Sequence, residues 1–238
     1  MSASAEAREL LAPTGRLRVA LYLGGPSSAL KAPDGSLRGV GHDLGRELAR
    51  ELRVPFEPVF FERIAEAVDA TRAARVDVVF SNATPERAKV LDYSQPYLGI
   101  GLGYLARAGS PVTKIEGVDK PGVFIAVLAG GTSDSVLSRS LRQAQIVRAR
   151  SVAEGIELLK SGQADLLATQ KATLFEAGDQ VPGSRVLDGN WGVEQHAIGI
   201  PKGRERALPF LREFVDDAVQ RGVVRDAAKR AGLRGTEN

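Results

Sequence analysis

The sequence predicts an α/β protein made of two similar halves. Short apolar runs rich in β-branched residues alternate with segments whose apolar residues recur at helical spacing, and this alternation occurs twice along the 238 residues. Two glycine-punctuated β runs, at 99–105 and 197–200, flank the second series. The alternation is typical of mostly parallel sheets flanked by helices, and its repetition indicates two lobes.

The first half contains a β-α-β-α-β unit. Leu44, Leu48 and Leu52 recur at helical spacing and mark its first helix, whereas the last strand is the apolar run from Val76 to Phe80. Strands are predicted at 17–23, 56–60 and 76–80, and helices at 43–52 and 64–74.

The second half repeats the pattern and is followed by two helices. Strands are predicted at 123–128, 145–150 and 165–169, and helices at 133–142, 153–161 and 173–179. The two C-terminal helices are predicted at 205–221 and 223–231.

The composition excludes several classes of protein. Only 5% of the residues are aromatic, and the net charge of +3 comes from interleaved basic and acidic residues, so no nucleic-acid groove is expected. The chain has no cysteine, and its two histidines, His42 and His196, lack metal-ligand spacing, so no metal site is expected. No run approaches the roughly 20 apolar residues that span a bilayer.

The segment 81–97 is the most informative one. Ser81, Asn82 and Thr84 are small polar residues at the carboxyl end of a predicted strand, where open α/β sheets place ligands. Thr84 suits a helix N-cap with Pro85 at the first helical position. Arg87 follows in that turn and is a candidate carboxylate clamp, since its guanidinium is a planar fork of donors. The alternative is that Arg87 only pairs with Glu86, Asp92 or another surface carboxylate.

This segment resembles the Thr-Pro-Glu-Arg and Asp-Tyr-Ser-x-Pro-Tyr signature of extracellular solute-binding proteins of the polar amino acid type, which feed ABC importers. Further matching segments follow in the family's order, at 17–20, 39–44, 62–64, 125–133, 162–165 and 196–203. The resemblance implies a two-lobed, periplasmic-binding-protein-like fold of type II, with the two glycine-punctuated β runs as a two-strand hinge. Lobe one is then 1–108 with 193–238, and lobe two is 109–192.

The implied function is that of a monomeric solute receptor without catalytic activity or cofactor. It would capture a small carboxylate-bearing ligand, an amino acid or a similar molecule, between the lobes by hinge closure and deliver it to an ABC transporter permease. The resemblance implies a periplasmic location. Residues 1–16 lack the pattern of a secretory signal, so either a signal was trimmed or this member stays in the cytoplasm.

The resemblance also assigns site residues by position. Arg87 matches the arginine that grips the ligand's α-carboxylate, with Ser81, Asn82 and Thr84 beside it. Gly131, Thr132 and Ser133 match a loop that opens a helix and offers N–H donors to the same carboxylate. The alternative for Thr132 and Ser133 is ordinary helix capping.

Gln170 departs from the family pattern. Amino acid binders typically have an aspartate here, whose charge holds the ligand's α-ammonium, and a neutral amide does not neutralise a buried cation. Either another acid supplies the charge, with Glu62 and Glu194 as candidates that are equally interpretable as surface carboxylates, or the ligand lacks a standard α-ammonium. Tyr22 is a candidate wall of the side-chain pocket.

Two other functions use the same fold. Cyclohexadienyl dehydratases hold a substrate carboxylate with the arginine and need an acid to protonate a leaving hydroxyl, for which Glu62, Glu176 or Glu194 are available. The sensor module of a membrane receptor is the third possibility, which a transmembrane segment and a signalling domain would distinguish.

Overall fold

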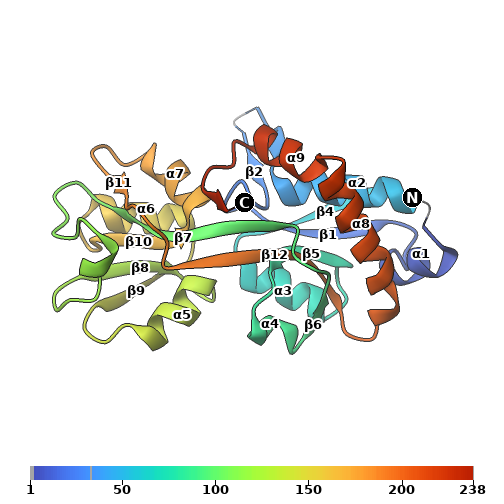
Figure 1. The fold of residues 1–238 in the computed structure, drawn as a ribbon, viewed down its shortest axis with the longest axis horizontal. Coiled ribbons are helices and arrows are strands. Elements are labelled where there is room, and N and C mark those ends of the chain that lie inside the picture. Colours follow the sequence, from blue (N-terminus) through green and yellow to red (C-terminus); the bar gives the residue numbers. More distant parts are fainter. Residues whose placement is uncertain (1–2, 33, 238) are drawn as a thin grey trace. The chain divides into compact units, whose positions relative to one another are not determined.

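The computed structural model describes residues 3–32 and 34–237, and its chain divides into two compact units (Figure 1). Unit 1 contains the described residues as far as Gly99 together with Gln195–Leu233. Unit 2 contains Ile100–Glu194 and the C-terminal residues from Arg234 onward. Each unit has its own hydrophobic clusters, so each is described by itself.

Unit 1 is built on strands in the order β4-β1-β5-β12 (Figure 1). β1 runs parallel to both β4 and β5, whereas β12 is antiparallel to β5 and also pairs with β6. The strands are β1 Leu17–Tyr22, β4 Phe56–Phe61, β5 Val78–Asn82, β6 Leu91–Tyr93 and β12 Gly192–Pro201, with a separate hairpin of β2 Leu30–Lys31 and β3 Leu37–Arg38. The helices are α1 Ala5–Leu11, α2 Val40–Leu52, α3 Ile64–Arg72, α4 Pro85–Ala88, the 3-10 helix η2 Glu205–Ala207, α8 Leu208–Gln220 and α9 Val223–Ala231.

Alternate residues of β1 point into two different cores. Val19 and Leu21 join the cluster that contains Leu48 of α2 together with residues of α8 and α9. Ala20, between them, belongs to the cluster that contains Ala67 of α3. Because successive side chains of a strand point to opposite faces, helices cover both faces of this sheet. Both faces are apolar from Val19 onward, which explains why the alternating pattern of a half-buried strand is missing there.

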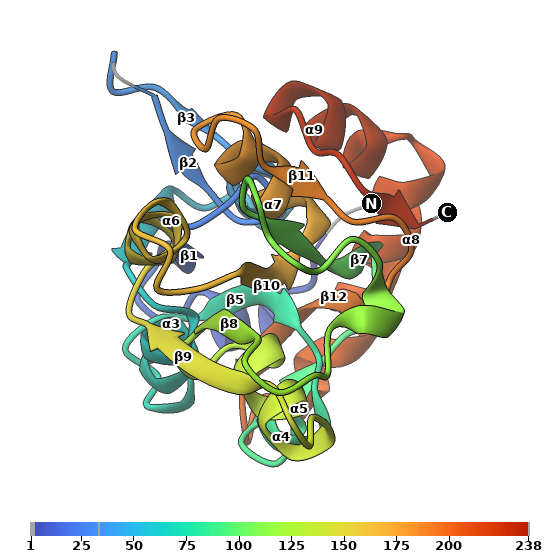
Figure 2. The same ribbon diagram turned by 90° about the vertical axis from the view of Figure 1, so that its left-hand side faces the viewer.

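Unit 2 repeats this architecture around strands in the order β7-β10-β8-β9. The strands are β7 Leu98–Ala106, β8 Phe124–Leu128, β9 Gln145–Ala149, β10 Leu166–Gln170, β11 Arg185–Val186 and β13 Thr236–Glu237, of which β11 and β13 pair with β7. The helices are the 3-10 helix η1 Ile115–Gly117, α5 Thr132–Ser140, α6 Val152–Lys160 and α7 Lys171–Gly178. Figure 2 views this unit from the side of β8 and β9, with α5 on one side of these strands and α6 on the other.

The faces of the unit 2 sheet alternate in the same way. Ile125 and Val127 of β8 join the cluster that contains Leu137 of α5. Ala126 belongs to the cluster of Leu159 in α6 and of residues in α7. The second half of the sequence is therefore a second α/β sandwich with its own core.

The boundary between the units lies inside two strands. β7 contains the boundary between Gly99 and Ile100, and β12 contains that between Glu194 and Gln195. The sequence placed these limits at 108/109 and 192/193. The first differs because residues 102–106 of β7 pair with β10, which assigns them to unit 2. The segment from Arg234 also belongs to unit 2, whereas the sequence placed everything after 192 in lobe one.

The predicted helices and strands are present with shifted ends. The additions are α1, the hairpin of β2 and β3, the 3-10 helix η1 and the short strands β6, β11 and β13. Ser4 caps α1 by accepting the Ala7 backbone N–H at 3.0 Å, a local signal that the sequence interpretation did not use. β5 begins at Val78 and continues through Asn82, whereas the sequence predicted a strand from 76 to 80. Ser81 and Asn82 are thus strand residues, because both pair with β12.

Asp77, just before β5, is a fully buried carboxylate held by two arginines. Its Oδ1 lies 2.7 Å from Nη2 of Arg18 and 3.1 Å from Nη1 of Arg204, and its Oδ2 accepts the Arg18 Nε–H at 2.9 Å. The Arg18 backbone N–H also donates to Oδ2 at 3.0 Å. These bonds link β1, β5 and the segment that leads to α8, so this charge cluster ties the start of unit 1 to its C-terminal helices.

Asp119 organises the loop after α5 through its carboxylate. Its carboxylate accepts the backbone N–H groups of Ala144, Gln143 and Arg142, which lower its pKa. A carboxyl whose pKa is lowered by folding stabilises the protein above its unfolded pKa of about 3.9, and this stability is lost as the pH falls through the folded pKa.

We therefore expect Asp119→Ala to lower the free energy of unfolding at pH 7 and to cost progressively less as the pH falls below about 4. Urea unfolding of both proteins between pH 2.5 and 7 measures this difference. Asp188→Ala is the matched control, because Asp188 is exposed in the same unit. A difference between wild type and Asp119→Ala that stays constant with pH would contradict the assignment.

The helices of the described residues do not include one that is both long enough and apolar enough to span a membrane.

Candidate functional site

In unit 1 the predicted ligand residues gather at the carboxyl edge of the parallel strands. Tyr22, the last residue of β1, is in register with Phe61, the last residue of β4. β5 runs parallel to β1 and ends at Asn82. The segments that follow these strands therefore start from one edge of the sheet, which is where α/β proteins bind ligands.

Arg87 lies in the short helix α4 at this edge. Thr84 is the N-cap, as predicted, and its side-chain oxygen accepts the Arg87 backbone N–H at 3.2 Å, while Pro85 occupies the first helical position. The guanidinium is half-buried, and its Nη1 donates to the backbone oxygen of Asn82 at 3.1 Å. This bond folds the side chain back over the end of β5.

Among the residues that the structure describes, none forms an ion pair with Arg87. The predicted alternative partner Asp92 instead binds Lys202, the residue that directly follows β12. A guanidinium has five N–H donors in a fixed fork, and one bond to Asn82 uses only part of that capacity. Arg87 therefore keeps the ability to bind a carboxylate in a bidentate manner.

The charge of Arg87 also acts on the interior of this edge. Burial raises the pKa of the Tyr93 phenol, and this shift is opposed by a hydrogen bond to Ser81 and by the positive charge of Arg87. The Oγ of Ser81 lies 3.0 Å from the Tyr93 hydroxyl. Arg87 is thus close enough to the pair formed by Ser81 and Tyr93 for its charge to lower the pKa of the phenol.

The polar side chains of Ser81 and Asn82 are engaged within unit 1. Ser81 is buried against Tyr93, and the Asn82 Oδ1 accepts the Gln195 backbone N–H at 2.9 Å. These two side chains fix the end of β5 against β6 and β12. This arrangement holds the Asn82 backbone oxygen that positions Arg87.

Tyr22 and Glu62 differ in their surroundings. Tyr22 is half-buried, and its ring folds over Gly24, where an added Cβ would lie 1.7 Å from the ring carbon Cζ. Any larger residue at position 24 would displace the ring. Glu62, directly after β4, is exposed. It lies at the same edge as Arg87, but as a solvent-facing carboxylate.

Unit 2 offers a helix N-terminus without a side-chain cap. α5 begins at Thr132 with Gly131 as its N-cap, and no side-chain hydrogen bond from a described residue caps it. The predicted alternative, capping by Thr132 or Ser133, is therefore not the arrangement found, and Ser133 is buried. The first N–H groups of a helix have no intrahelical partner and attract anions.

The N-terminus of α2 in unit 1 contrasts with that of α5. There the backbone N–H groups of Val40 and Gly41 donate to the carbonyl oxygens of Pro26 and Ser27, at 2.9 and 3.1 Å. Gly39 makes this close approach possible, since its φ of 155° is in the region that favours glycine and an added Cβ would lie 2.2 Å from the Ser28 oxygen. The start of α2 is occupied by its own chain.

Gln170 and Glu194 meet in unit 2. Gln170 ends β10, and its Nε2 donates a short hydrogen bond to Oε2 of Glu194, whose side chain is 5% exposed. The two residues come together because β10 and the segment that leads into β12 both attach to β7 at Leu102. Leu102 is in register with Gln170, and its backbone oxygen accepts the Trp191 backbone N–H at 3.0 Å. The sequence named both residues as separate candidates, but the pairing depends on the register of a third strand.

Trp191 and Lys171, near this pair in the sequence, have contacts within unit 2. The Trp191 Nε1–H donates to the Gly103 oxygen at 3.1 Å, and its ring packs against Tyr104 with centroids 6.1 Å apart. The aliphatic part of Lys171 lies against Gly103. In the described part of the chain, no three His, Cys, Asp or Glu side chains come together in a way that would hold a metal ion.

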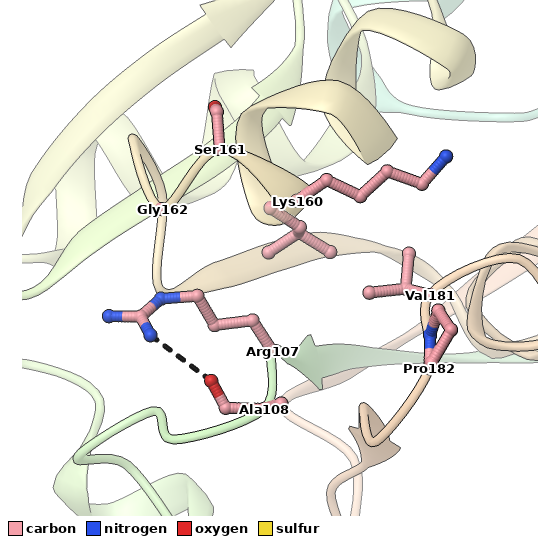
Figure 3. A pocket seen from close by; sticks show the side chains of 8 residues that line it. Arg107, Ala108, Lys160, Ser161, Gly162, Val181 and Pro182 are labelled. Atoms are coloured by element: carbon pink, nitrogen blue, oxygen red, sulfur yellow. Dashed lines mark hydrogen bonds between the residues drawn. The ribbon is translucent and has the colours of Figure 1, made fainter.

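A cavity of about 350 Å³ in unit 2 lies away from these residues (Figure 3). The basic side chains that line the cavity do not point to a common position. Arg107 binds Asp165 at 2.7 Å, while Lys160 points elsewhere and binds Glu157. The cavity is lined by residues that precede β10 in the sequence, whereas Gln170 is the last residue of β10. Its lining consists of Arg107, Ala108, Leu159, Lys160, Ser161, Gly162, Val181 and Pro182. None of the predicted ligand residues contributes to it.

Comparison with known proteins identifies the family. The family model described as bacterial extracellular solute-binding proteins, family 3, matches residues 17–230. The chain belongs to this family. It is 25% identical over 180 residues to the ABC transporter glutamine-binding protein GlnH of Bacillus subtilis (strain 168), an alignment that covers 74% of this chain and 66%, just under two thirds, of that relative.

Solved structures show the same fold for this family 3 protein. A mutant of ArgBP from T. maritima aligns with a TM-score of 0.84 and 23% identity, covering 95% of this chain and 99% of that one. The ancestral amino acid-binding protein AncCDT-1, a precursor of cyclohexadienyl dehydratase, aligns with a TM-score of 0.81 and 25% identity over 93% of this chain and 97% of that one. The predicted fold, that of type II periplasmic binding proteins, is confirmed.

Proposed function

We propose that this protein is the solute receptor of an ABC importer and that it takes a small carboxylate-bearing ligand, an amino acid or a close analogue. Its membership of a solute-binding family and its likeness to amino-acid-binding relatives support the proposal. The observation that carries it is Arg87, a half-buried guanidinium at the carboxyl edge of a parallel sheet that has no ion-pair partner among the described residues.

In this proposal the two units contribute different groups to the ligand. Arg87 in unit 1 binds the ligand's α-carboxylate first. Unit 2 then adds the N–H groups at the start of α5, contacts that exist only in the closed form, so the ligand selects closure. Loss of water from the site strengthens the attraction between guanidinium and carboxylate. Outside the cytoplasmic membrane, the closed form is the signal that the membrane-embedded permease recognises.

We propose that the protein has no catalytic activity of its own, and the likeness to a dehydratase precursor makes this worth testing. Of the three acids that the sequence offers for such a reaction, Glu62 is exposed, Glu176 lies in α7, and Glu194 accepts a hydrogen bond from the amide of Gln170. Incubation with prephenate, followed by the ultraviolet absorbance of an aromatic product, is expected to show no turnover.

A thermal-shift screen tests the proposed function. We expect a set of proteinogenic amino acids, their N-modified and deaminated analogues, dicarboxylates and prephenate to contain a ligand that raises the melting temperature. At 100 times its dissociation constant a ligand stabilises the folded state by about 2.7 kcal/mol. The shift should disappear in Arg87→Ala. Stabilisation only by compounds without a carboxylate, such as neutral sugars, would contradict the proposal.

A further inference from the structure

The segment that follows α9 crosses from one unit to the other without a linker. Gly232, in the left-handed conformation with a φ of 67°, ends α9, and Leu233 packs against the core of unit 1. The next residue, Arg234, already belongs to unit 2. Adjacent Cα atoms are only about 3.8 Å apart, so there is no slack between the two anchored residues.

Residues 234–237, which we call the strap, dock on α7 of unit 2. The guanidinium of Arg234 binds Oδ2 of Asp179 at 2.8 Å and lies over the ring of Phe175, 4.9 Å from its centroid. Asp179 is the C-cap of α7, and the last turn of this helix has no basic residue of its own. Because the carboxyl end of a helix favours a positive charge, Arg234 supplies a cation that α7 lacks.

The strap also holds β7 where this strand enters unit 2. The Gly101 backbone N–H donates to the Gly235 oxygen at 3.1 Å, and β13, Thr236–Glu237, pairs with β7. Unit 2 begins at Ile100, so this bond is made directly after the boundary between the units. Gly235 lies so close to α7 that an added Cβ would be 2.5 Å from the Cβ of Lys171, and this approach therefore requires glycine.

The side-chain contacts of the strap are weak enough to open. The side chains of Arg234 and Asp179 are 45% and 68% exposed, and pairs of exposed charges contribute little to stability. A cation over an aromatic ring also contributes little at an exposed position. By contrast, α9 is anchored in the core of unit 1 through Val224, Ala227 and Ala231. The strap is therefore the part that detaches first.

We propose that the strap is a releasable restraint on the rearrangement of the two units. While it is docked, it joins α9 of unit 1 to α7 and β7 of unit 2, in addition to the two strands that connect the units. A rearrangement that moves α9 away from α7 undocks the strap, because the junction between Leu233 and Arg234 has no slack to absorb it.

Docking therefore favours the arrangement of the units in which its contacts form, by the free energy of those contacts. The restraint acts in the ligand-free protein and does not depend on the identity of the ligand. The competing explanation is local: the strap covers part of unit 2 and leaves the rearrangement of the units unaffected.

Two substitutions weaken docking in the full chain. Arg234→Ala removes the ion pair and the cation over the ring of Phe175, whereas Gly235→Val blocks the close approach to α7. Arg225→Ala is the matched control, because Arg225 is an exposed arginine of α9 whose partner Asp226 lies on the same helix.

Hydrogen exchange at the Gly101 amide measures docking, since this N–H donates to the strap. We expect the amide to exchange about three- to thirtyfold faster in Arg234→Ala, the range for losing one exposed ion pair and one exposed cation–π contact. Arg225→Ala should exchange at the wild-type rate.

Electron spin resonance between two labels measures the rearrangement of the units. The chain has no cysteine, so Val219→Cys in α8 and Glu157→Cys in α6 place one label on each unit, at exposed positions. We expect the ligand-free protein to have a broader distribution of label distances in Arg234→Ala and Gly235→Val than in the otherwise wild-type chain. Arg225→Ala should keep the wild-type distribution.

The combination of the two readouts decides between the explanations. If exchange at Gly101 accelerates while the label distances keep their distribution, the strap is a local part of unit 2 and the proposal is wrong. If neither changes, the strap does not dock in solution and the proposal is also wrong. Equal broadening in Arg225→Ala would contradict it as well. If Gly235→Val does not fold, Arg234→Ala decides, because it alters an exposed side chain.

Discussion

Replacing Arg87 with alanine should weaken ligand binding by about 2–5 kcal/mol, the cost of truncating one partner of a buried, hydrogen-bonded charge pair. Most of this loss comes from leaving the ligand's carboxylate without its charged donor in a site from which water is excluded. The fold should be little affected, because the side chain of Arg87 makes a single hydrogen bond within the described part of the chain, to the backbone oxygen of Asn82. Calorimetric titration with the ligand found by thermal shift measures the loss.

Two further variants sharpen the Arg87 test. Arg87→Lys keeps the charge but loses the planar fork, so we expect an intermediate affinity. Arg63→Ala is the matched control, because Arg63 is an exposed arginine of the same unit that pairs with Glu66 on the surface. Unchanged affinity in Arg87→Ala would exclude the role of Arg87 as the carboxylate clamp. An equal loss of affinity in Arg63→Ala would show that any positive charge of unit 1 contributes to binding, not Arg87 in particular.

Replacing Asp77 with alanine should cost about 3–5 kcal/mol of the free energy of unfolding, the range for breaking a buried ion pair by removing one partner. The substitution leaves the guanidinium groups of Arg18 and Arg204, which are mostly buried, without their carboxylate partner. It also removes the acceptor of the Arg18 backbone N–H. Urea unfolding at neutral pH measures the change. Asp77 is fully buried and lies before β5, whereas the predicted ligand residues follow that strand.

The comparison for Asp77 is a surface aspartate of the same unit. Asp69 pairs with Arg72 across one helical turn, and both side chains are more than half exposed. Such pairs contribute about 0–1 kcal/mol, so Asp69→Ala should unfold at nearly the wild-type urea concentration. An Asp77→Ala variant as stable as Asp69→Ala would show that the cluster does not hold unit 1 together.

Local patterns explain what the sequence predicts correctly. The N-cap Thr84 and the following Pro85 are a signal contained in adjacent residues, and the structure has the cap and the helix at these positions. The apolar runs of β1 and β8 are similarly local, because each strand is buried on both faces by its own helices.

Pairings that depend on register are not readable from the sequence. The bond between Gln170 and Glu194 requires that β7 lies between β10 and β12 with Leu102 opposite Gln170. The burial of Ser81 likewise requires β6 to bring Tyr93 to its hydroxyl. Asp77 looks like a polar interruption in an apolar run, and its partners Arg18 and Arg204 are far away in the sequence.

The C-terminal segment gives the chain an unusual property for experiments. The polypeptide passes from unit 1 to unit 2 in β7, returns in β12, and passes to unit 2 again after Leu233, where the Gly101 N–H donates to the Gly235 oxygen at 3.1 Å and Arg234 binds Asp179. The helix α1 near the other end belongs to unit 1. A fluorophore on α1 and another on the segment 234–237 therefore belong to different units, so energy transfer between them reports a rearrangement of the units.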